Sequence, residues 1–495
     1  MTIFPLELLK SRLPKALLVF GVILVWVEVV ILLSAFSSLP PRVPLFYSQP
    51  WGVGQLAATP VLFLFPLLGA VILGGDLLFS EVLWRRREVV LATSLLGLGV
   101  ISGGLLLVSL ARIVFLTAGA LQVTLAVRIF LAASLAFCLS LGLTPVVERV
   151  ARRLGIIDDP ETHQHPAILH KKPVPRAGAV AFLGGFLITS LLFLPLVKRL
   201  IGLYLGALVA TTLGVLDDSR DLNPYLRLGI QVLAALIIVA AGIGITFFRN
   251  PFGGVISLTT VDIPINIFGE HHILLLADLF ALLWLVWMMN MSSWSNGVDG
   301  QFSGTVSITF LVLTILSLRF VSYEPLQGQT ALLSAIAGGA ALGLLPRTWH
   351  PAKIFWGFGA TACGLIIATL SILSGAKVAT ASLVLLVPIL DALVAIGRRV
   401  LRGQSPVWGD REHLHHHLLN RGLTQRQVAS LYWLLAGICG ILALYTAGKS
   451  KALTLLMAGG VVGFVLILVN LGGRGLRERL EGKKEQTGGG EDELG

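Results

Sequence analysis

Long apolar runs separated by short polar loops make up almost the whole chain. A helix needs about 20 mostly apolar residues to cross the hydrocarbon core of a bilayer. Applied to this pattern, that length predicts an all-α polytopic membrane bundle of about 14 transmembrane helices. The predicted spans are residues 16–36, 57–80, 89–110, 123–147, 178–197, 200–216, 230–248, 273–289, 305–321, 329–346, 354–373, 378–397, 429–448 and 452–470.

The composition agrees with a membrane protein. Of the 495 residues, 55% are apolar and 13% are charged, and the mean hydropathy is +0.87, values that exclude a soluble multi-domain chain. Cys138, Cys363 and Cys439 each lie in a different apolar segment, so neither a CxxC metal site nor a disulfide framework is expected. The sequence shows no nucleic-acid-binding pattern, and we predict no nucleic-acid partner.

Lysine and arginine are unequally divided between the two sets of loops. With the N-terminus inside, the cytoplasmic loops hold 27 of the 37 basic residues and the opposite loops hold 8. Because basic loops stay on the cytoplasmic side, this asymmetry predicts a multi-pass protein of a bacterial inner membrane with both termini in the cytoplasm. It also explains the net charge of +11. The basic stretch Lys10–Lys15 before the first span is interpreted as part of a retained signal anchor.

The character of the chain changes near residue 123, where the inner loops become longer and more polar. We therefore divide it into an N-terminal three-span extension (1–122), a membrane core (123–470) and a tail (471–495). The tail contains Gly, Lys and Glu but few apolar residues, a composition typical of disorder.

Asp217 and Asp218 stand side by side at the inner end of the predicted span 200–216. Two adjacent carboxylates at a membrane edge repel each other unless water, a cation or a proton relieves the repulsion. The pair indicates either a functional site or a solvated loop between two helices.

A basic cluster precedes the span that begins at Gly178. Pro173 and Pro175 disfavour helix in the residues before them, so Lys172 and Arg176 are predicted to lie in an extended loop. The forked guanidinium group of arginine and the compact positive charge of lysine both bind phosphate oxygens well. The cluster is either a phosphate clamp or a further cytoplasmic anchor.

The inner loop 290–304 carries amides and glycines but no basic residue. It includes Asn290, Asn296 and Asp299. Glycine lets the backbone approach a ligand closely, and amide groups suit nucleobases and sugars. Because Asn-Gly and Asp-Gly pairs also form ordinary turns, a ligand-binding loop and a polar turn both stay open.

Histidines gather in the last inner loop. His413, His416 and His417 would share one helical face, with His415 close by. Metal binding is one hypothesis, but no cysteine or carboxylate set completes a zinc site. With Arg411 nearby, we interpret the histidines as an anion-binding cluster, and we predict that they converge with the basic cluster on one phosphate site.

Taken together, these motifs resemble the polyprenyl-phosphate N-acetylhexosamine-1-phosphate transferase family over residues 123–470. The stretch KPVPRAG at 172–178 is similar to that family's KPxPRxGG. DDSRDL at 217–222, followed by Arg227, is similar to its DDxxxL motif. SPVWGDREHLHH at 405–416 is the most specific match.

This family joins the sugar-1-phosphate of a UDP-linked amino sugar to polyprenyl phosphate, releases UMP and uses magnesium. The resemblance therefore implies a transferase at the cytoplasmic membrane face that initiates a lipid-linked cell-envelope glycan. Its implied partners are a UDP-sugar and polyprenyl phosphate within the membrane, and a homodimer is left open. By the same resemblance, the catalytic residues are Asp217, Asp218, His413, His415 and His416.

The resemblance also assigns binding residues. Those for substrate are Lys172, Arg176, Asn290, Asn296, Asp299, Phe355 and Arg411. Of these, Asp299 matches the aspartate on the uracil side and Phe355 the aromatic residue that stacks on uracil. Asp218 and Asn296 are the implied metal-binding residues.

The chain departs from the family pattern at the implied magnesium site. Ser293 and Phe358 stand where the family has two magnesium-binding residues, and Asn296 replaces an aspartate. Phenylalanine cannot ligate Mg²⁺, which requires oxygen ligands in an octahedral shell. We therefore predict a transferase with altered metal use.

The alternative is a catalytically impaired homologue that binds polyprenyl phosphate or a nucleotide sugar, or that scaffolds glycan assembly. A secondary transporter is disfavoured, because its polar residues should lie in the middle of the membrane on broken helices.

Overall fold

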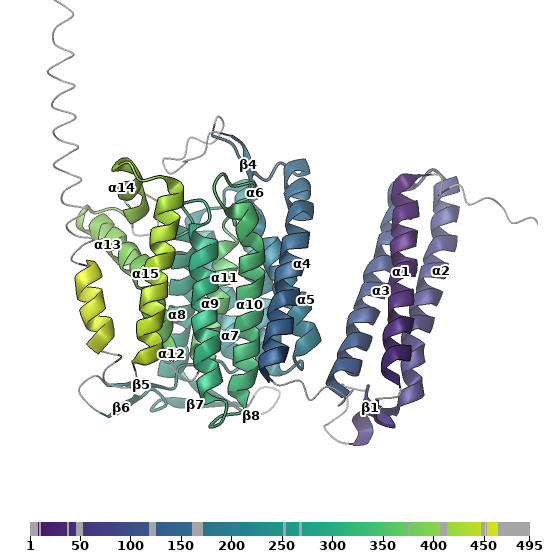
Figure 1. Cartoon of the computed structure of the whole chain (residues 1–495), viewed down its shortest axis with the longest axis horizontal. Coiled ribbons are helices and arrows are strands. Elements are labelled where there is room, and N and C mark those ends of the chain that lie inside the picture. Colours follow the sequence, from purple (N-terminus) through teal and green to yellow (C-terminus); the bar gives the residue numbers. More distant parts are fainter. Residues whose placement is uncertain are drawn as a thin grey trace, which may run out of the picture. The chain divides into compact units, whose positions relative to one another are not determined.

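The structure is a computed structural model, and it describes residues 8, 11–36, 39–45, 53–117, 125–160, 172–250, 254–266, 270–374, 377–405, 413–446, 451 and 453–463. Throughout these residues α-helices dominate, and the strands are short antiparallel pairs. Figure 1 shows most helices from residue 125 onward running side by side, as in a membrane bundle. The predicted all-α polytopic fold is confirmed.

The chain divides into two compact units. The first comprises Met1–Thr124 with Ile188–Pro195, and the second comprises Leu125–Leu187 with Leu196–Gly495. In the first unit, three helices pack against one another: α1 (Arg12–Ala35), α2 (Leu64–Arg85) and α3 (Val89–Thr117). Its short elements are β1 (Arg42–Pro44), η3 (Val53–Gln55), β2 (Leu56–Ala58) and η4 (Thr59–Phe63).

From Leu125 onward the chain forms the larger bundle. Its helices are α4 (Leu125–Arg153), α5 (Gly178–Phe193), α6 (Lys198–Arg220), α7 (Pro224–Ala240), α8 (Leu275–Trp294), α9 (Gln301–Phe320), α10 (Leu326–Thr348), α11 (Ala360–Leu373), α12 (Lys377–Val384), α13 (Leu386–Leu401), α14 (Leu414–Asn420) and α15 (Gln425–Tyr445). A further apolar helix spans Leu453–Gly463.

The number of membrane crossings is less definite than the fold class. Within the described ranges, 8 helices are long and apolar enough to cross a bilayer, or 9 if α12 and α13 together form one span. The helices at Leu17–Leu33, Gly178–Phe193, Pro224–Ala240, Ala360–Leu373 and Leu453–Gly463 are apolar but shorter. The count of fourteen spans stays a prediction.

The predicted span at 378–397 contains a sharp bend. The helix breaks at Leu385, and α12 and α13 meet at an angle of 85°. Pro388 lies in the first turn of α13. A proline has no N–H to donate and clashes with the carbonyl four residues earlier, which favours a break just before this point.

Small residues bring α10 against α4. At Gly339 a Cβ atom would lie 2.2 Å from the carbonyl oxygen of Ala133, and at Gly343 it would lie 2.4 Å from that of Phe137. Both glycines face α4 because they are four residues apart. This Gly-x-x-x-Gly spacing lets two membrane helices approach closely, so α4 and α10 pack tightly against each other.

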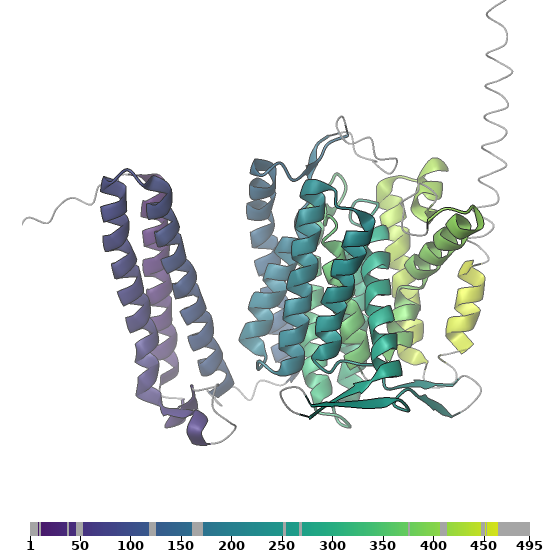
Figure 2. The ribbon, with the colours of Figure 1, turned by 180° about the vertical axis from the view of Figure 1, so that it is seen from behind.

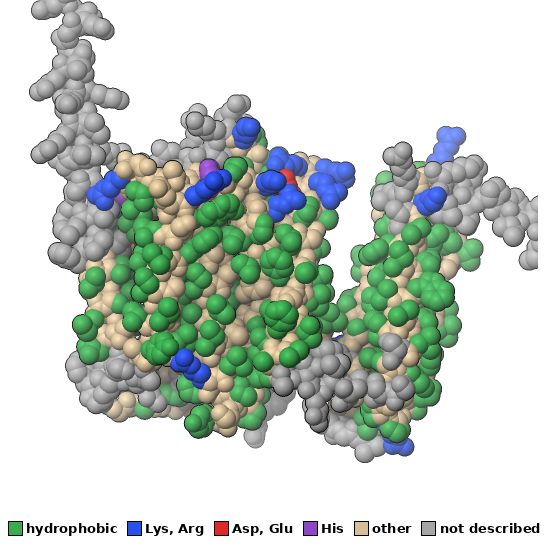
Figure 3. Space-filling model, in the orientation of Figure 1, with side chains coloured by type: hydrophobic (Ala, Val, Ile, Leu, Met, Phe, Trp, Pro, Cys, Tyr) green, Lys and Arg blue, Asp and Glu red, His purple; other side chains and the backbone are tan. Residues whose placement is uncertain are grey.

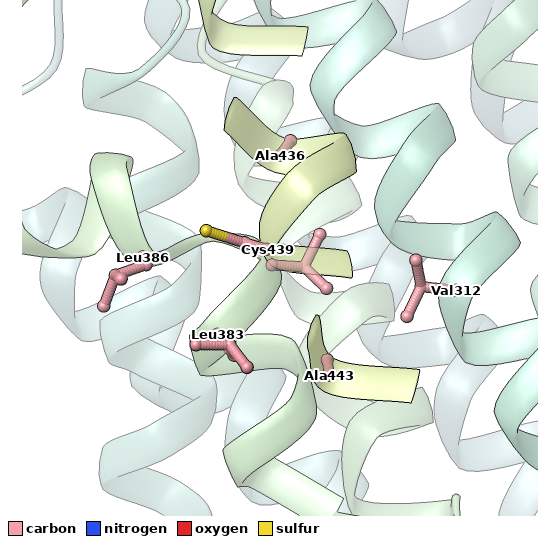
Figure 4. Close-up of a cluster of buried hydrophobic side chains, with 7 residues drawn as sticks. Val312, Leu383, Leu386, Ala436, Cys439 and Ala443 are labelled. Carbon is pink, nitrogen blue, oxygen red and sulfur yellow. The ribbon is translucent and has the colours of Figure 1, made fainter. Parts of the chain in front are cut away.

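Apolar side chains fill the space between the C-terminal helices. Figure 4 shows one cluster of such side chains, which includes Val312 of α9, Leu383 of α12, Leu386 of α13, and Ala436 and Cys439 of α15. All of these side chains are buried. The break between α12 and α13 is therefore fixed by packing on both of its sides.

The two ends of the larger bundle differ. One end carries α14 and the antiparallel pair β3 (Ile157–Asp158) and β4 (Val174–Pro175). The opposite end carries the pairs β5–β6 and β7–β8, as Figures 1 and 2 both show. These strands are β5 (Phe247–Arg249), β6 (Val255–Ser257), β7 (Asp262–Asn266) and β8 (Glu270–Leu274). In Figure 3 most Lys and Arg side chains of this bundle gather at the α14 end, while its flank is mostly hydrophobic.

Candidate active site

The carboxylate pair lies in the last turn of α6. This helix continues through Arg220 and ends at Asp221, whose backbone is left-handed with φ of 46°. The side chains of Asp217 and Asp218 are only 7% and 5% exposed. The interpretation of this pair as a solvated loop is therefore wrong, and both carboxylates need partners inside the protein.

Asp217 is paired with the first turn of α7. The side chain of Asn223 caps this helix and Pro224 occupies its first position, two features that fix where a helix begins. Arg227 then lies within reach, and its Nη1 donates to Asp217 Oδ2 over 3.0 Å. The backbone N–H of Leu222 donates to Asp217 Oδ1, also over 3.0 Å. Both oxygens of this carboxylate are thus engaged.

Asp218 is held by segments that are distant in sequence. Its Oδ2 accepts the backbone N–H of Phe358 over 2.8 Å, across 140 residues of chain. Arg176 Nε lies 3.8 Å from Asp218 Oδ1, and Arg176 Nη2 lies 3.4 Å from Asp158 Oδ2. The guanidinium of Arg176 therefore stands between two carboxylates, and 38% of its side chain remains exposed.

The short strand β4 positions Arg176. This strand confirms the predicted extended geometry of the proline-containing loop. The N–H of Phe355 donates to the carbonyl oxygen of Pro175 over 2.8 Å, and Gly178 N donates to Phe355 O over 2.8 Å. Phe355 thus joins the basic loop to the start of α11. Its predicted stacking on uracil stays a prediction.

Gly357 allows the contact between Asp218 and Phe358. Its backbone is left-handed, with φ of 69°, a conformation that glycine adopts without steric cost. A Cβ atom at this position would lie 2.0 Å from Asp218 Oδ2. Only a residue without a side chain leaves room for the carboxylate.

Phe358 turns its ring toward an arginine. The Arg227 Cζ atom lies 5.2 Å from the centroid of the ring, within the range of a cation–π interaction. Phe358 contributes a backbone N–H to Asp218 but no side-chain oxygen for a metal ion. Among the described residues, no group of three or more His, Cys, Asp or Glu side chains is arranged to hold a metal. The residues present do not fit the magnesium site that the resemblance implies.

The amide-rich segment is only partly a loop. Helix α8 continues through Trp294, so Asn290 and Ser293, which were expected in a loop, are helical. Asn290 Nδ2 donates to Gln231 Oε1 over 2.9 Å, which ties α8 to α7. Asn296 follows the helix and is half-buried. The substrate-binding roles of Asn290 and Asn296 stay predictions.

Asp299 connects two inner loops. Its Oδ2 lies 2.7 Å from His350 Nδ1 and accepts the N–H of Ala352 over 3.0 Å. The carbonyl oxygen of His350 in turn accepts from Arg426 Nη2 at the start of α15 over 3.0 Å. The carboxylate therefore orders the loop before α11, and its predicted place beside uracil stays untested.

The histidine motif is arranged differently from the prediction. His413 precedes α14 as its N-cap residue, so the prediction that His413, His416 and His417 share one helical face is wrong. Asp391 of α13 fixes this arrangement. Its Oδ2 lies 2.9 Å from His413 Nδ1, and its Oδ1 accepts the N–H of Leu414 over 2.8 Å.

Three of the predicted catalytic side chains are buried together here. The ring centroids of His413 and His415 are 5.7 Å apart, and those of His415 and His416 are 4.2 Å apart. Burial first, and then the charges of the neighbouring histidines, lower the pKa of His415 well below its usual value. This shift favours the neutral form of His415, and a neutral imidazole can still donate one hydrogen bond. The amide-rich segment approaches the same ring, because a Cβ at Gly297 would lie 2.3 Å from His415 Nε2.

Two predicted residues remain, Lys172 and Arg411. Lys172 is exposed just before β4, and Arg411 lies outside the described residues. Figure 1 shows β4, the end of α6 and α14 at the same end of the bundle. That the basic loop and the histidines serve one phosphate site stays a prediction.

Three residues at this end were not assigned a role from the sequence. The sequence offered a reason to single out Asp391, since a carboxylate inside a predicted span is energetically costly in a membrane and often has a function. Arg227 was part of a quoted motif, and its partner Asp217 became evident only from the structure. Nothing in the sequence pointed to His350 except its place in a short basic loop.

Part of the chain matches a known protein family. The family model described as glycosyl transferase family 4 matches residues 200–375, which include Asp217, Asp218, Arg227 and Phe358. The chain is 29% identical over 344 residues to the probable undecaprenyl-phosphate N-acetylglucosaminyl 1-phosphate transferase of Bacillus subtilis, covering 67% of this chain and 88% of the relative.

Two further relatives come from other bacteria. The decaprenyl-phosphate N-acetylglucosaminephosphotransferase of Mycobacterium tuberculosis is 30% identical, with 60% of this chain and 76% of the relative covered. The undecaprenyl-phosphate alpha-N-acetylglucosaminyl 1-phosphate transferase of Haemophilus influenzae is 27% identical, with 61% and 82% covered. The chain therefore belongs to the family of polyprenyl-phosphate N-acetylhexosamine-1-phosphate transferases.

Proposed function

We propose that this protein transfers an N-acetylhexosamine-1-phosphate, or a related sugar phosphate, from a UDP-sugar to polyprenyl phosphate. The reaction takes place at the cytoplasmic membrane face and begins a lipid-linked cell-envelope glycan. The observation that carries this proposal is the buried pair Asp217 and Asp218, which is lined by the partly exposed Arg176 and Arg227 at one end of a membrane bundle. The names of the relatives support the same reaction class.

The arrangement suits a reaction between two phosphates. An oxygen of the lipid phosphate attacks the phosphorus that bears the sugar, the P–O bond to the nucleotide phosphate breaks, and UMP leaves. Guanidinium groups form paired hydrogen bonds to phosphate oxygens, and such donors stabilise the charge that develops during phosphoryl transfer. Arg176 and Arg227 can act in this way, because 38% and 25% of their side chains are exposed. Asp218, held in place by the Phe358 N–H, can take the proton of the lipid phosphate.

A second candidate is a homologue that binds these substrates without transferring the sugar phosphate. The observation in its favour is Phe358, which lies beside Asp218 and supplies no metal ligand. Such a protein would keep affinity for the nucleotide sugar or the lipid phosphate through the arginines.

A transfer assay separates the two candidates. Purified full-length protein is mixed with UDP-N-acetylglucosamine and undecaprenyl phosphate, with Mg²⁺ or with EDTA, and release of UMP is measured. We expect UMP release and formation of lipid-linked sugar phosphate. Binding of UDP without UMP release, tested across several UDP-linked amino sugars, would favour the non-catalytic homologue.

The proposed orientation places the α14 end in the cytoplasm and rests on the basic side chains there. In intact bacteria, cysteines introduced as Ser219→Cys and Ser405→Cys should not react with a membrane-impermeant thiol reagent. The matched control is Thr260→Cys, an exposed position beside the strands at the opposite end, which should be labelled. Labelling of either serine position from outside, above the background of the native cysteines, would reverse the orientation.

A further inference from the structure

The two buried carboxylates already have cationic partners. Arg227 Nη1 is 3.0 Å from Asp217 Oδ2, and Arg176 Nε is 3.8 Å from Asp218 Oδ1. The arginine side chains are several times more exposed than the carboxylates, which are 7% and 5% exposed. A ligand that reaches this end of the bundle therefore meets guanidinium groups before carboxylate oxygens.

The surroundings of Arg227 hold it in this place. Its guanidinium lies against the Phe358 ring, with 5.2 Å between Cζ and the ring centroid. A planar guanidinium stacks on aromatic faces and stays charged at all relevant pH values. Phe358 is itself fixed, because its N–H donates to Asp218 and the preceding Gly357 has no side chain.

A divalent cation would have to compete with this arrangement. Mg²⁺ requires near-octahedral oxygen ligands at about 2.0–2.1 Å. Both oxygens of Asp217 and one of Asp218 already accept hydrogen bonds. The Phe358 side chain supplies no oxygen ligand. A cation bound by Asp217 would need to displace Arg227 and leave its charge half-buried. A cation bound by the remaining oxygen of Asp218 would face the positive charge of Arg176, whose Nε lies 3.8 Å from that oxygen.

We propose that Arg227, held between Asp217 and the Phe358 ring, takes the place of a divalent cation at this site. The diphosphate of a nucleotide is then bound by guanidinium groups, and no divalent cation is needed. Only the choice of a nucleotide diphosphate as ligand rests on the proposed function. The exclusion of a cation by Arg227 rests on the contacts of the carboxylate pair.

The first test measures metal binding without any nucleotide. Mn²⁺ is titrated into purified full-length protein, and the bound fraction is followed by electron paramagnetic resonance. We expect no site with a dissociation constant below about 1 mM in the wild type. Arg227→Gln, which removes the charge, should raise Mn²⁺ affinity at least about tenfold. The matched variant Arg227→Lys keeps the charge and should bind Mn²⁺ as poorly as the wild type.

A third variant keeps the test decisive if Arg227→Gln does not fold. Phe358→Asp removes the ring and adds a carboxylate, and it should gain one Mn²⁺ site, whereas Phe358→Leu, which adds no oxygen, should gain none. A single tight Mn²⁺ site in the wild type that is lost in Asp218→Asn would overturn the proposal. Arg227→Gln protein that is folded but gains no Mn²⁺ affinity would do the same.

The second test uses UDP. Its affinity for the wild type should agree within about twofold between buffers containing Mg²⁺ and EDTA. A loss of tenfold or more in EDTA would contradict the inference. If UDP binds in neither buffer, the proposed nucleotide-sugar function fails, while the Mn²⁺ titrations still decide whether Arg227 excludes a cation.

Discussion

Replacing Asp218 with asparagine should lower the rate of sugar-phosphate transfer by about 10²–10³-fold, the usual effect of removing one preorganised group from a transition state. Asparagine has nearly the same shape as aspartate, and its oxygen can still accept the N–H of Phe358. The variant loses the negative charge that faces Arg176 and the basic oxygen that can take a proton from the lipid phosphate. The measurement is the initial rate of UMP release.

The matched control for this variant is Asp221→Asn. Asp221 belongs to the same motif, but it is exposed and lies just beyond the end of α6. Asparagine tolerates its left-handed backbone well. We expect transfer by Asp221→Asn to stay within about twofold of the wild type, since exposed substitutions have small effects. Equal losses in both variants would mean that the motif acts through its overall charge, and full activity of Asp218→Asn would remove Asp218 from the mechanism.

Replacing Gly357 with alanine should destabilise the protein, because both its backbone conformation and the adjacent carboxylate oppose an added methyl group. A left-handed backbone costs a non-glycine residue about 1–2 kcal/mol. The new Cβ would also lie 2.0 Å from Asp218 Oδ2, so the carboxylate must move. The hydrogen bond from Phe358 is then lost, and a bond to a charged group contributes about 1.5–3 kcal/mol. Thermal unfolding in detergent, together with UDP binding, measures both consequences.

Gly403→Ala separates the two contributions. Gly403 has almost the same backbone, with φ of 68°, but nothing lies within 4 Å of its Cβ position. It should therefore show only the backbone cost of about 1–2 kcal/mol and should keep UDP affinity unchanged. If Gly357→Ala and Gly403→Ala lower stability equally, the close approach of Gly357 to Asp218 is not a constraint in solution.

Much of the architecture could be predicted because a bilayer allows few solutions. Backbone N–H and C=O groups in hydrocarbon must pair within the segment, so long apolar runs become helices. This reasoning places most helices within a few residues of their true ends. It does not predict breaks, since Pro145 and Pro346 lie inside continuous helices while Pro388 follows a sharp bend. Whether a proline bends a helix depends on what packs around it.

The candidate site, too, could be predicted only in part from the sequence. Motif spacing identified Asp217, Asp218 and the histidines, because their residue types are unusual beside apolar spans. It did not identify Asp391 as the partner of His413, since these residues lie on different elements. It also assigned His413 to a helical face, although the bond to Asp391 holds this residue outside α14.

The sequence alone determined that this is an all-α membrane protein and which polar residues stand at the ends of its spans, because hydrophobic length and local residue type are properties of the chain itself. The tertiary structure decided which of these residues meet. Asp218 and the Phe358 N–H are 140 residues apart in the chain, and Arg227 lies over the Phe358 ring because α7 packs beside α6. Such contacts depend on how the helices pack and on the room that a residue like Gly357 leaves between them, and no local pattern encodes that packing.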